Sequence, residues 1–288
     1  MRKETLGSVG LLLVTVLWGG GFIATDRSLL AFTPLQIMML RFLIASCIFL
    51  PFSLPLLKKT DGKQVKAGVL LGVFLFFAFL LQTLGLKYST PSKNAFLTTT
   101  NVVFVPLICF FFQKKRPSAG ELFAVVLALI GAAVLSLEHD FSIGKGEILS
   151  LLCALCFAFQ IYFTGLFVER YSALSLNCIQ MVTAFLCSVV AVLFLEKSPW
   201  DFSNMKSVFS VLYLGVISTS LTFFLQTLSQ KYVPQVRAVI LLSLEGVFAT
   251  LFSVMLLQEQ IPPKGIVGSC LILAAAFVAE LWPRKAEV

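Results

Sequence analysis

Charged residues are scarce in this sequence, and long stretches have none at all. Asp, Glu, Lys and Arg make up 12% of its 288 residues, about half of what a soluble globular domain carries. The ranges 5–25, 67–86 and 171–195 contain no charged residue, and a helix needs about 20 residues to cross a bilayer. This scarcity excludes a soluble protein. It predicts an all-helical integral membrane protein, because backbone groups in lipid must bond within their own segment.

Residues that carry metal and nucleotide chemistry are also few. His139 is the single histidine, and the sequence contains no Gly-x4-Gly-Lys-Ser/Thr motif and no aspartate-rich metal motif. These absences disfavour an ATP-driven pump and a membrane-embedded enzyme, and we expect no metal and no cofactor. The seven Cys lie almost wholly in apolar stretches, which indicates buried thiols rather than a disulfide framework.

The Lys and Arg residues lie mostly between the apolar stretches, although the formal net charge is +8. This placement sets membrane topology and does not indicate nucleic-acid binding. With both termini in the cytoplasm, fourteen Lys and Arg fall on the inner side and seven on the outer side. The asymmetry predicts a multi-pass protein of the cell membrane with cytoplasmic N- and C-termini. The ten predicted helices are 7–25, 34–57, 67–87, 92–113, 118–137, 147–168, 173–195, 207–230, 235–257 and 263–282.

The chain repeats itself at half its length. Residues 81–88 read LQTLGLKY and residues 225–232 read LQTLSQKY, an offset of 226 minus 82, or 144. The same offset relates Lys93 to Arg237 and Trp18 to Tyr162. Because five is an odd number of helices, a second five-helix unit enters the membrane from the opposite side. The sequence therefore predicts two inverted repeats, 1–140 and 141–288, around a central cavity, a common design of secondary transporters.

Polar side chains recur at helical spacing inside several of the predicted helices, as at Asn94, Thr98 and Asn101. Such groups are costly in lipid, so they either bond a neighbouring helix or face a water-filled cavity. Both interpretations stay open for each single residue. The predicted residues of the substrate cavity are Trp18, Arg41, Gln82, Asn94, Thr98, Asn101, Gln160, Gln180, Thr222, Gln226 and Glu245.

Two of these residues carry a charge deep in a predicted span. The helical rise places Arg41 about 10 Å and Glu245 about 12 Å from the nearer surface. Each is either a structural charge with a partner or a functional one. A carboxylate has a short stem and does not reach the surface from this depth, so we predict that Glu245 takes part in the transport cycle.

Several short motifs are spread over nearly the whole chain: 17–22 (LWGGGF), Pro34 to Arg41, 94–96 (NAF), 105–106 (VP), 233–238 (VPQVRA), 242–245 (LSLE) and 258–259 (QE). Together they resemble the EamA branch of the drug/metabolite transporter superfamily. The resemblance implies ten helices around a central cavity, with the fifth and tenth at the periphery, and transport of amino acids, other metabolites, sugars or drugs, often outward. The chain departs from the family at 112–115 (FQKK) and at Gly246.

These observations favour a secondary active transporter, an exporter of small metabolites such as amino acids that works by alternating access. The alternatives are a multidrug or organic-cation efflux carrier and a metabolite importer of the same fold. A membrane-embedded enzyme is less favoured, and a channel is disfavoured by the inverted repeat and the lack of a charged ring. The expected partners are a small-molecule substrate and the lipid bilayer, not nucleic acid, with the chain a monomer or weak homodimer.

Overall fold

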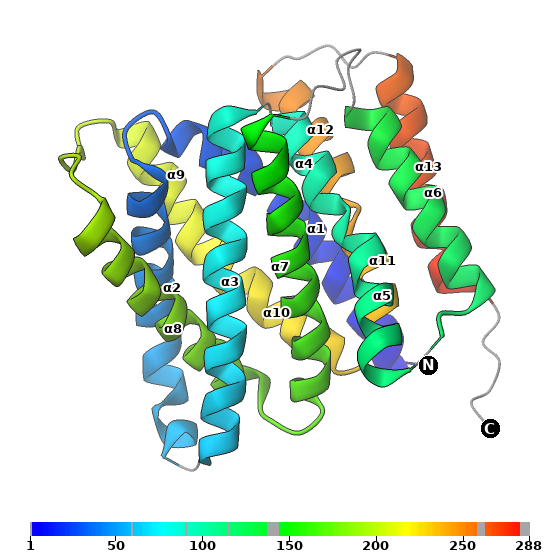
Figure 1. The fold of residues 1–288 in the computed structure, drawn as a ribbon, viewed down its shortest axis with the longest axis horizontal. Helices are drawn as coiled ribbons and strands as arrows, with labels where there is room; N and C mark the ends of the chain where they lie inside the picture. The colour runs from blue at the N-terminus through cyan, green and yellow to red at the C-terminus, as the bar shows by residue number, and fades with distance from the viewer. Residues whose placement is uncertain are drawn as a thin grey trace.

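The described part of the chain contains helices as its only regular elements. The computed structural model describes residues 2–58, 60–89, 91–114, 116–136, 144–257 and 263–282. His139 and the 258–259 motif lie outside these ranges. In chain order (Figure 1) the elements are α1 Arg2–Ser28, α2 Pro34–Leu57, α3 Gly62–Tyr88, α4 Pro91–Thr99, α5 Asn101–Gln113, α6 Ala119–Ser136, α7 Lys145–Val168, α8 Ala173–Leu195, α9 Met205–Gly215, the π-helix η1 Val216–Leu221, α10 Thr222–Gln230, α11 Gln235–Leu242, α12 Glu245–Leu257 and α13 Pro263–Leu281.

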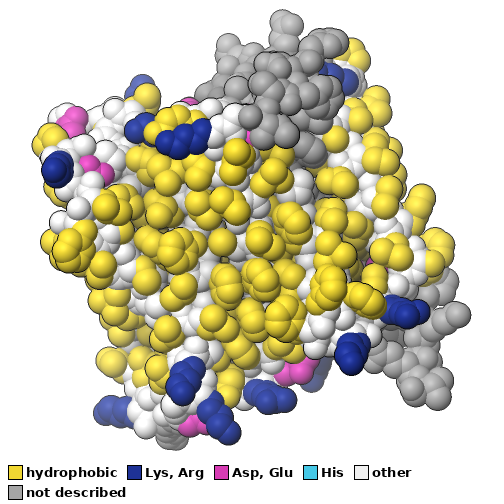
Figure 2. Space-filling model, viewed as in Figure 1, with side chains coloured by type: hydrophobic (Ala, Val, Ile, Leu, Met, Phe, Trp, Pro, Cys, Tyr) yellow, Lys and Arg dark blue, Asp and Glu magenta, His cyan; other side chains and the backbone are white. Residues whose placement is uncertain are grey.

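The surface between the two ends of the bundle is apolar. Among the described residues, eight helical stretches are long and apolar enough to cross a membrane, and two shorter ones, Leu97–Gln113 and Ala119–Val134, are also apolar. Figure 2 shows hydrophobic side chains over the middle of one face and Lys and Arg near its two ends. Large side chains such as Phe111 and Phe194 are 73% and 79% exposed, which only lipid tolerates at this density. The protein is therefore a multi-pass membrane protein, as the sequence predicts.

Three of the predicted helices are not continuous α-helices. The predicted helix 92–113 is interrupted at Thr100, and the predicted helix 235–257 is interrupted at Ser243 and Leu244. At each interruption a side-chain hydroxyl bonds a carbonyl three residues earlier: Thr100 Oγ1 donates to Leu97 at 2.5 Å, and Ser243 Oγ donates to Ile240 at 2.6 Å. Such bonds compete with the helical backbone ladder. The predicted helix 207–230 instead contains the π-helical turn η1.

Helix α1 belongs to the first half of the sequence but packs among helices of the second half. It contacts α9, α10, α11 and α12, and its glycines allow close approach. A Cβ on Gly19 would lie 2.8 Å from the backbone nitrogen of Ala249 in α12, so the two backbones are in direct contact. Helices α6 and α13 pack against each other at one edge of the bundle (Figure 1).

The loop after α8 is tied to the beginning of α2. Thr33 caps α2 by accepting a hydrogen bond from the backbone of Gln36, and its hydroxyl donates to the carboxylate of Glu196. The side chain of Gln36 donates to the carbonyls of Ser198 and Pro199 at 3.1 and 3.2 Å. The hydroxyl of Thr33 holds the pKa of Glu196 below its usual value, with help from the backbone N–H of Ser198.

The opposite end of the bundle is fastened by a buried arginine. Arg237, in the first turn of α11, is 4% exposed. It donates to Glu4 Oε1 of α1 at 2.8 Å and, through its other terminal nitrogen, to the carboxylate of Glu280 in α13. Ser8 also donates to this carboxylate, at 3.2 Å. The beginning of α1 and the end of α13 therefore lie at the same end of the bundle (Figure 1).

We expect Arg237→Gln to destabilise the folded protein, because Glu4 and Glu280 would lose their shared cation. Breaking a fully buried ion pair costs about 3–5 kcal/mol. The carboxylates here are 21% and 33% exposed, so we expect about 1–3 kcal/mol. The measurement is the thermal unfolding midpoint in detergent. Arg170→Gln, at an exposed arginine, is the matched control, and an equal decrease in both variants would contradict the prediction.

Candidate functional site

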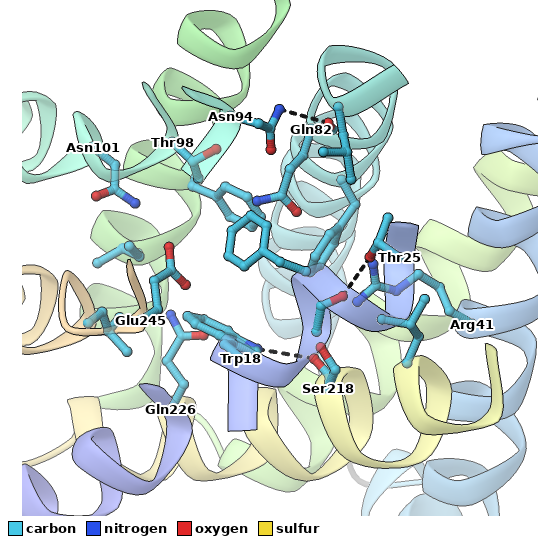
Figure 3. A pocket seen from close by; sticks show the side chains of 18 residues that line it. Trp18, Thr25, Arg41, Gln82, Asn94, Thr98, Asn101, Ser218, Gln226 and Glu245 are labelled. Atoms are coloured by element: carbon cyan, nitrogen blue, oxygen red, sulfur yellow. Dashed lines mark hydrogen bonds between the residues drawn. The ribbon is translucent and has the colours of Figure 1, made fainter. Parts of the chain in front are cut away.

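A cavity lies among helices from both halves of the chain (Figure 3). Its walls come from α1, α2, α3, α4, α5, α7, α9, η1, α10, α11 and α12, and no described residue of α6 or α13 takes part. The volume open to the centre of a water molecule is ≈ 40 Å³, and one water needs about 10–15 Å³ by the same measure. The cavity in this conformation is therefore small, with room for a few water molecules.

The structure brings most of the predicted cavity residues together. Gln160, Gln180 and Thr222 are the three predicted residues that are not part of the lining. Helix α8, which carries Gln180, contributes no lining residue at all. The predicted residues that do line the cavity are Trp18, Arg41, Gln82, Asn94, Thr98, Asn101, Gln226 and Glu245.

Gln160 and Gln180 belong to a chain of buried amides behind the cavity. Gln226 donates to Gln160 Oε1 at 3.4 Å, Gln160 donates to Gln180 Oε1 at 3.5 Å, and Gln180 donates to Asn177 Oδ1 at 2.6 Å. These bonds connect α10, α7 and α8. The amides therefore act as interhelical hydrogen bonds in this conformation. Thr222 accepts a hydrogen bond from the indole Nε1 of Trp18 at 2.9 Å, which fixes the ring that faces the cavity.

Arg41 of α2 enters the cavity from one side as an unpaired buried cation. It is 1% exposed, and its Nε donates to Thr219 Oγ1 of the π-helical turn at 3.0 Å. Its guanidinium carbon lies 3.7 Å from the ring centroid of Phe79, which is a close cation–π contact. The terminal nitrogen Nη2 is buried and has no hydrogen-bond partner among the described residues. Arg41 therefore keeps its Nη2 amino group available for a ligand.

Glu245 enters the cavity from the opposite side (Figure 3). It is 8% exposed and forms no ion pair with any described residue, Arg41 included. Glu245 is the first residue of α12, directly after the interruption at Leu244. The positive end of the helix dipole favours a carboxylate at this position. The broken helix thus places a deep carboxyl group that has no ion-pair partner among the described residues.

The two helix interruptions occupy equivalent positions of the predicted repeat. The offset of 144 relates Thr100 to Leu244 and Asn101 to Glu245. Asn101 begins α5 as Glu245 begins α12, and both side chains line the cavity. Gln82 and Gln226 form a second equivalent pair in the lining. Discontinuous helices at equivalent positions are a known way to form binding sites in membrane transporters.

Two carbonyl oxygens add to the unsatisfied groups of the cavity. Asn94 donates to the Gln82 carbonyl at 3.1 Å and to Ser150 Oγ at 2.9 Å, but its Oδ1 has no partner among the described residues. Within the same part of the chain, Oε1 of Gln226 also has no partner. Buried polar atoms are nearly always satisfied by protein or water, so these two acceptors and Nη2 of Arg41 are groups that can bond water or a ligand.

Aromatic rings form the apolar part of the lining, and sequence reasoning did not single out Phe79 and Phe157. Their ring centroids lie 5.1 Å apart in an edge-to-face contact. The sequence contains 29 Phe, so composition could not select these two. One signal was present for Phe79, because the offset of 144 relates it to Phe223. The rings of Phe79 and Phe223 are in contact, with centroids 5.7 Å apart.

Comparison with known proteins identifies the family. The EamA-like transporter family matches residues 5–137 and again residues 144–280, which include every residue of the cavity. This chain belongs to the EamA-like transporter family. A relative from Archaeoglobus fulgidus, named "Uncharacterized transporter", is 33% identical over 281 residues, which cover 97% of this chain and 87% of that protein. The uncharacterized transporter YoaV of Bacillus subtilis is 23% identical, and the match covers 94% of this chain and 95% of YoaV.

A solved crystal structure has the same fold as this EamA-like protein. The superposition covers 98% of this chain and 99% of the other chain, with a TM-score of 0.82 and 18% sequence identity. At that identity the likeness concerns the fold alone. Family membership and the names of the relatives indicate a membrane transporter. The chemistry of the cavity is therefore interpreted in terms of transport.

Proposed function

We propose that this protein is a secondary transporter that exports small zwitterionic metabolites, such as amino acids, by alternating access. One observation carries the proposal. A buried cavity between the two halves holds an unpaired cation, Arg41, and an unpaired carboxylate, Glu245, on opposite sides. Unpaired charges are costly at membrane depth and usually mark a pathway for substrate or ions.

The chemistry of the lining matches an α-amino acid. The free Nη2 amino group of Arg41 suits a carboxylate, because a planar guanidinium donates hydrogen bonds in fixed directions that match carboxylate oxygens. Glu245 and the free carbonyl oxygens of Asn94 and Gln226 suit an ammonium group. The rings of Trp18 and Phe79 and their neighbours suit an apolar side chain. A cation without a carboxylate would use Glu245 and the rings but not Arg41, which makes an organic-cation carrier the second candidate.

Alternating access follows from the proposed arrangement of two inverted repeats, 1–140 and 141–288, with ten crossings in total. The two family matches, at 5–137 and 144–280, support the division. Figure 1 supports the inversion: α3 ends and α4 begins at the upper end of the bundle, whereas α10 ends and α11 begins at the lower end. Contact between the equivalent rings of Phe79 and Phe223 fits a pseudo-twofold axis that passes near them in the membrane plane.

The proposed orientation places the Arg237–Glu4–Glu280 cluster at the cytoplasmic side of the cell membrane. We expect a reporter that is active only in the cytoplasm to function when fused after Val288, because the Lys and Arg asymmetry favours this orientation. A second fusion in the loop between α8 and α9, near Lys197, serves as the control and should report the outer side. Activity of an exclusively outer-side reporter at Val288 would contradict the orientation.

The deciding experiment is transport by purified protein in proteoliposomes. Vesicles loaded with one unlabelled compound are mixed with a labelled trace of the same compound, and counterflow is measured for a panel of amino acids, their decarboxylated amines and organic cations. We expect counterflow for at least one amino acid and none for its amine. Counterflow of amines and organic cations alone would favour the second candidate, and no counterflow across the panel would oppose both.

A further inference from the structure

A second hollow lies on the lipid-facing side of α1, separate from the cavity. Its floor is α1 from Gly20 to Arg27, and its walls are residues of α9 and α12 on either side of that helix. The volume open to the centres of water molecules is ≈ 500 Å³, and none of its lining residues belongs to the cavity. Tyr213 of α9 closes the deep end, where its hydroxyl donates to the Leu17 carbonyl at 2.7 Å. We refer to this hollow as the α1 groove.

The α1 groove is apolar along its length and basic at its mouth. Seven residues separate Gly20 from Arg27, which corresponds to about 10 Å of helix. Phe209 and Leu256, one on each wall, are 68% and 58% exposed. At the mouth, the exposed residues Arg27 and Lys206 come from adjacent helix ends. The Ser207 hydroxyl donates to the Arg27 carbonyl at 2.8 Å and holds these ends together.

The two cations at the mouth have no acidic partner among the residues that the structure describes. The ion pairs among the described residues involve Arg237 alone, so Arg27 and Lys206 pair neither with Asp26 nor with any other described carboxylate. Two neighbouring cations at the end of a lipid-facing apolar slot present a positive site at headgroup level and an apolar surface at acyl-chain level. A phospholipid with an anionic headgroup has the same two parts in the same order.

We propose that the α1 groove is a binding site for one anionic phospholipid. Its headgroup phosphate lies between Arg27 and Lys206, and one acyl chain lies along α1 between Phe209 and Leu256. Two features favour this occupant over a second copy of the chain: the charge at the mouth, and the position of the groove between two helices that flank a third. The proposal depends on the membrane location and not on what the cavity transports.

Native mass spectrometry of the purified protein in detergent tests this site. The protein is titrated with phosphatidylglycerol and, separately, with phosphatidylcholine of the same acyl chains. Each cation near the surface contributes about a fivefold gain in affinity for an anionic lipid. The double variant Arg27→Gln/Lys206→Gln should therefore bind phosphatidylglycerol about twenty-five-fold more weakly. Phosphatidylcholine should lose much less affinity, because its choline group offsets the charge of its phosphate. The matched control, Lys87→Gln/Lys197→Gln, removes two exposed cations outside the groove and should bind like the wild type.

Two further measurements test the acyl-chain part of the site. Phe209→Ala with Leu256→Ala should weaken the binding of both lipids, because it removes apolar surface from each wall. Glycerol phosphate, which has the headgroup charge but no acyl chains, should not displace bound phosphatidylglycerol. Equal affinity of the wild type for the two lipids, an equal loss in the control double variant, or displacement by glycerol phosphate would each overturn the proposal.

Discussion

Glu245→Gln is expected to leave the protein folded and to lower the initial rate of transport by at least about tenfold. Glutamine keeps the shape and the hydrogen-bonding capacity of the side chain, so the first turn of α12 and the cavity walls should persist. What is lost is the charge, which no described residue neutralises. We infer that this carboxylate binds the cationic part of the substrate, or a proton, in one state of the cycle and releases it in the other.

The experiment compares variants in proteoliposomes with matched amounts of reconstituted protein over a range of pH. Glu245→Leu should reduce the rate at least as much as Glu245→Gln, because it also removes the polar contact. Glu169→Gln, at an exposed position, provides the control for a general effect of charge. If the carboxylate exchanges a proton, the wild-type rate should change with pH, and that change should disappear in Glu245→Gln. Wild-type rates with an unchanged pH profile in Glu245→Gln would make this residue structural.

The ends of the helices were predictable where the sequence carries an explicit signal. Residues 34–57 and 173–195 were predicted as helices, and α2 and α8 have these same bounds. For α2 the signal is Thr33 before Pro34, because the threonine caps the first turn and proline loses no intrahelical bond there. The apolar stretches likewise predicted an all-helical membrane protein, because helix is the default for an isolated run in lipid.

The interruptions inside the helices could not be predicted from the same signals. Thr100 lies between Thr99 and Asn101, and Ser243 lies between Leu242 and Leu244. Hydrophobicity alone does not distinguish a continuous helix from two shorter ones at such positions. The interruption depends on a hydroxyl that bonds a backbone carbonyl, and serine and threonine also make such bonds in unbroken helices. Thr83 does so within α3, where it donates to the Phe79 carbonyl at 2.8 Å.

The prediction of the cavity had a similar limit. Polar residues at helical spacing indicated which helix faces avoid lipid, but a buried amide serves equally well as a cavity wall or as a bond between helices. Gln226 serves both purposes, since it lines the cavity and donates to Gln160. Gln160 and Gln180 lie one layer behind it. Only the three-dimensional arrangement of α7, α8 and α10 separates these layers.

Arg41→Gln is expected to have opposite effects on transport and on stability. Arg41 is buried and its Nη2 amino group has no hydrogen-bond partner among the described residues. An uncompensated buried charge destabilises a folded protein. Replacement by glutamine should therefore leave the thermal unfolding midpoint unchanged or raise it. The same change removes the proposed partner of the substrate carboxylate, which is worth about 2 kcal/mol or more, so the KM for a transported amino acid should rise at least about thirtyfold.

Arg41→Lys separates charge from geometry at this position. Lysine keeps the positive charge, but it loses the planar fork and stacks less well on an aromatic face such as that of Phe79. We therefore expect a KM between those of the wild type and Arg41→Gln. The decarboxylated amine of the same substrate gives the sharpest comparison. The wild type should discriminate against it, and Arg41→Gln should lose that discrimination, because the lost contact is the one to the carboxylate. A lower unfolding midpoint for Arg41→Gln with unchanged discrimination between amino acid and amine would show that Arg41 supports the fold through Thr219 and Phe79 and does not bind the substrate.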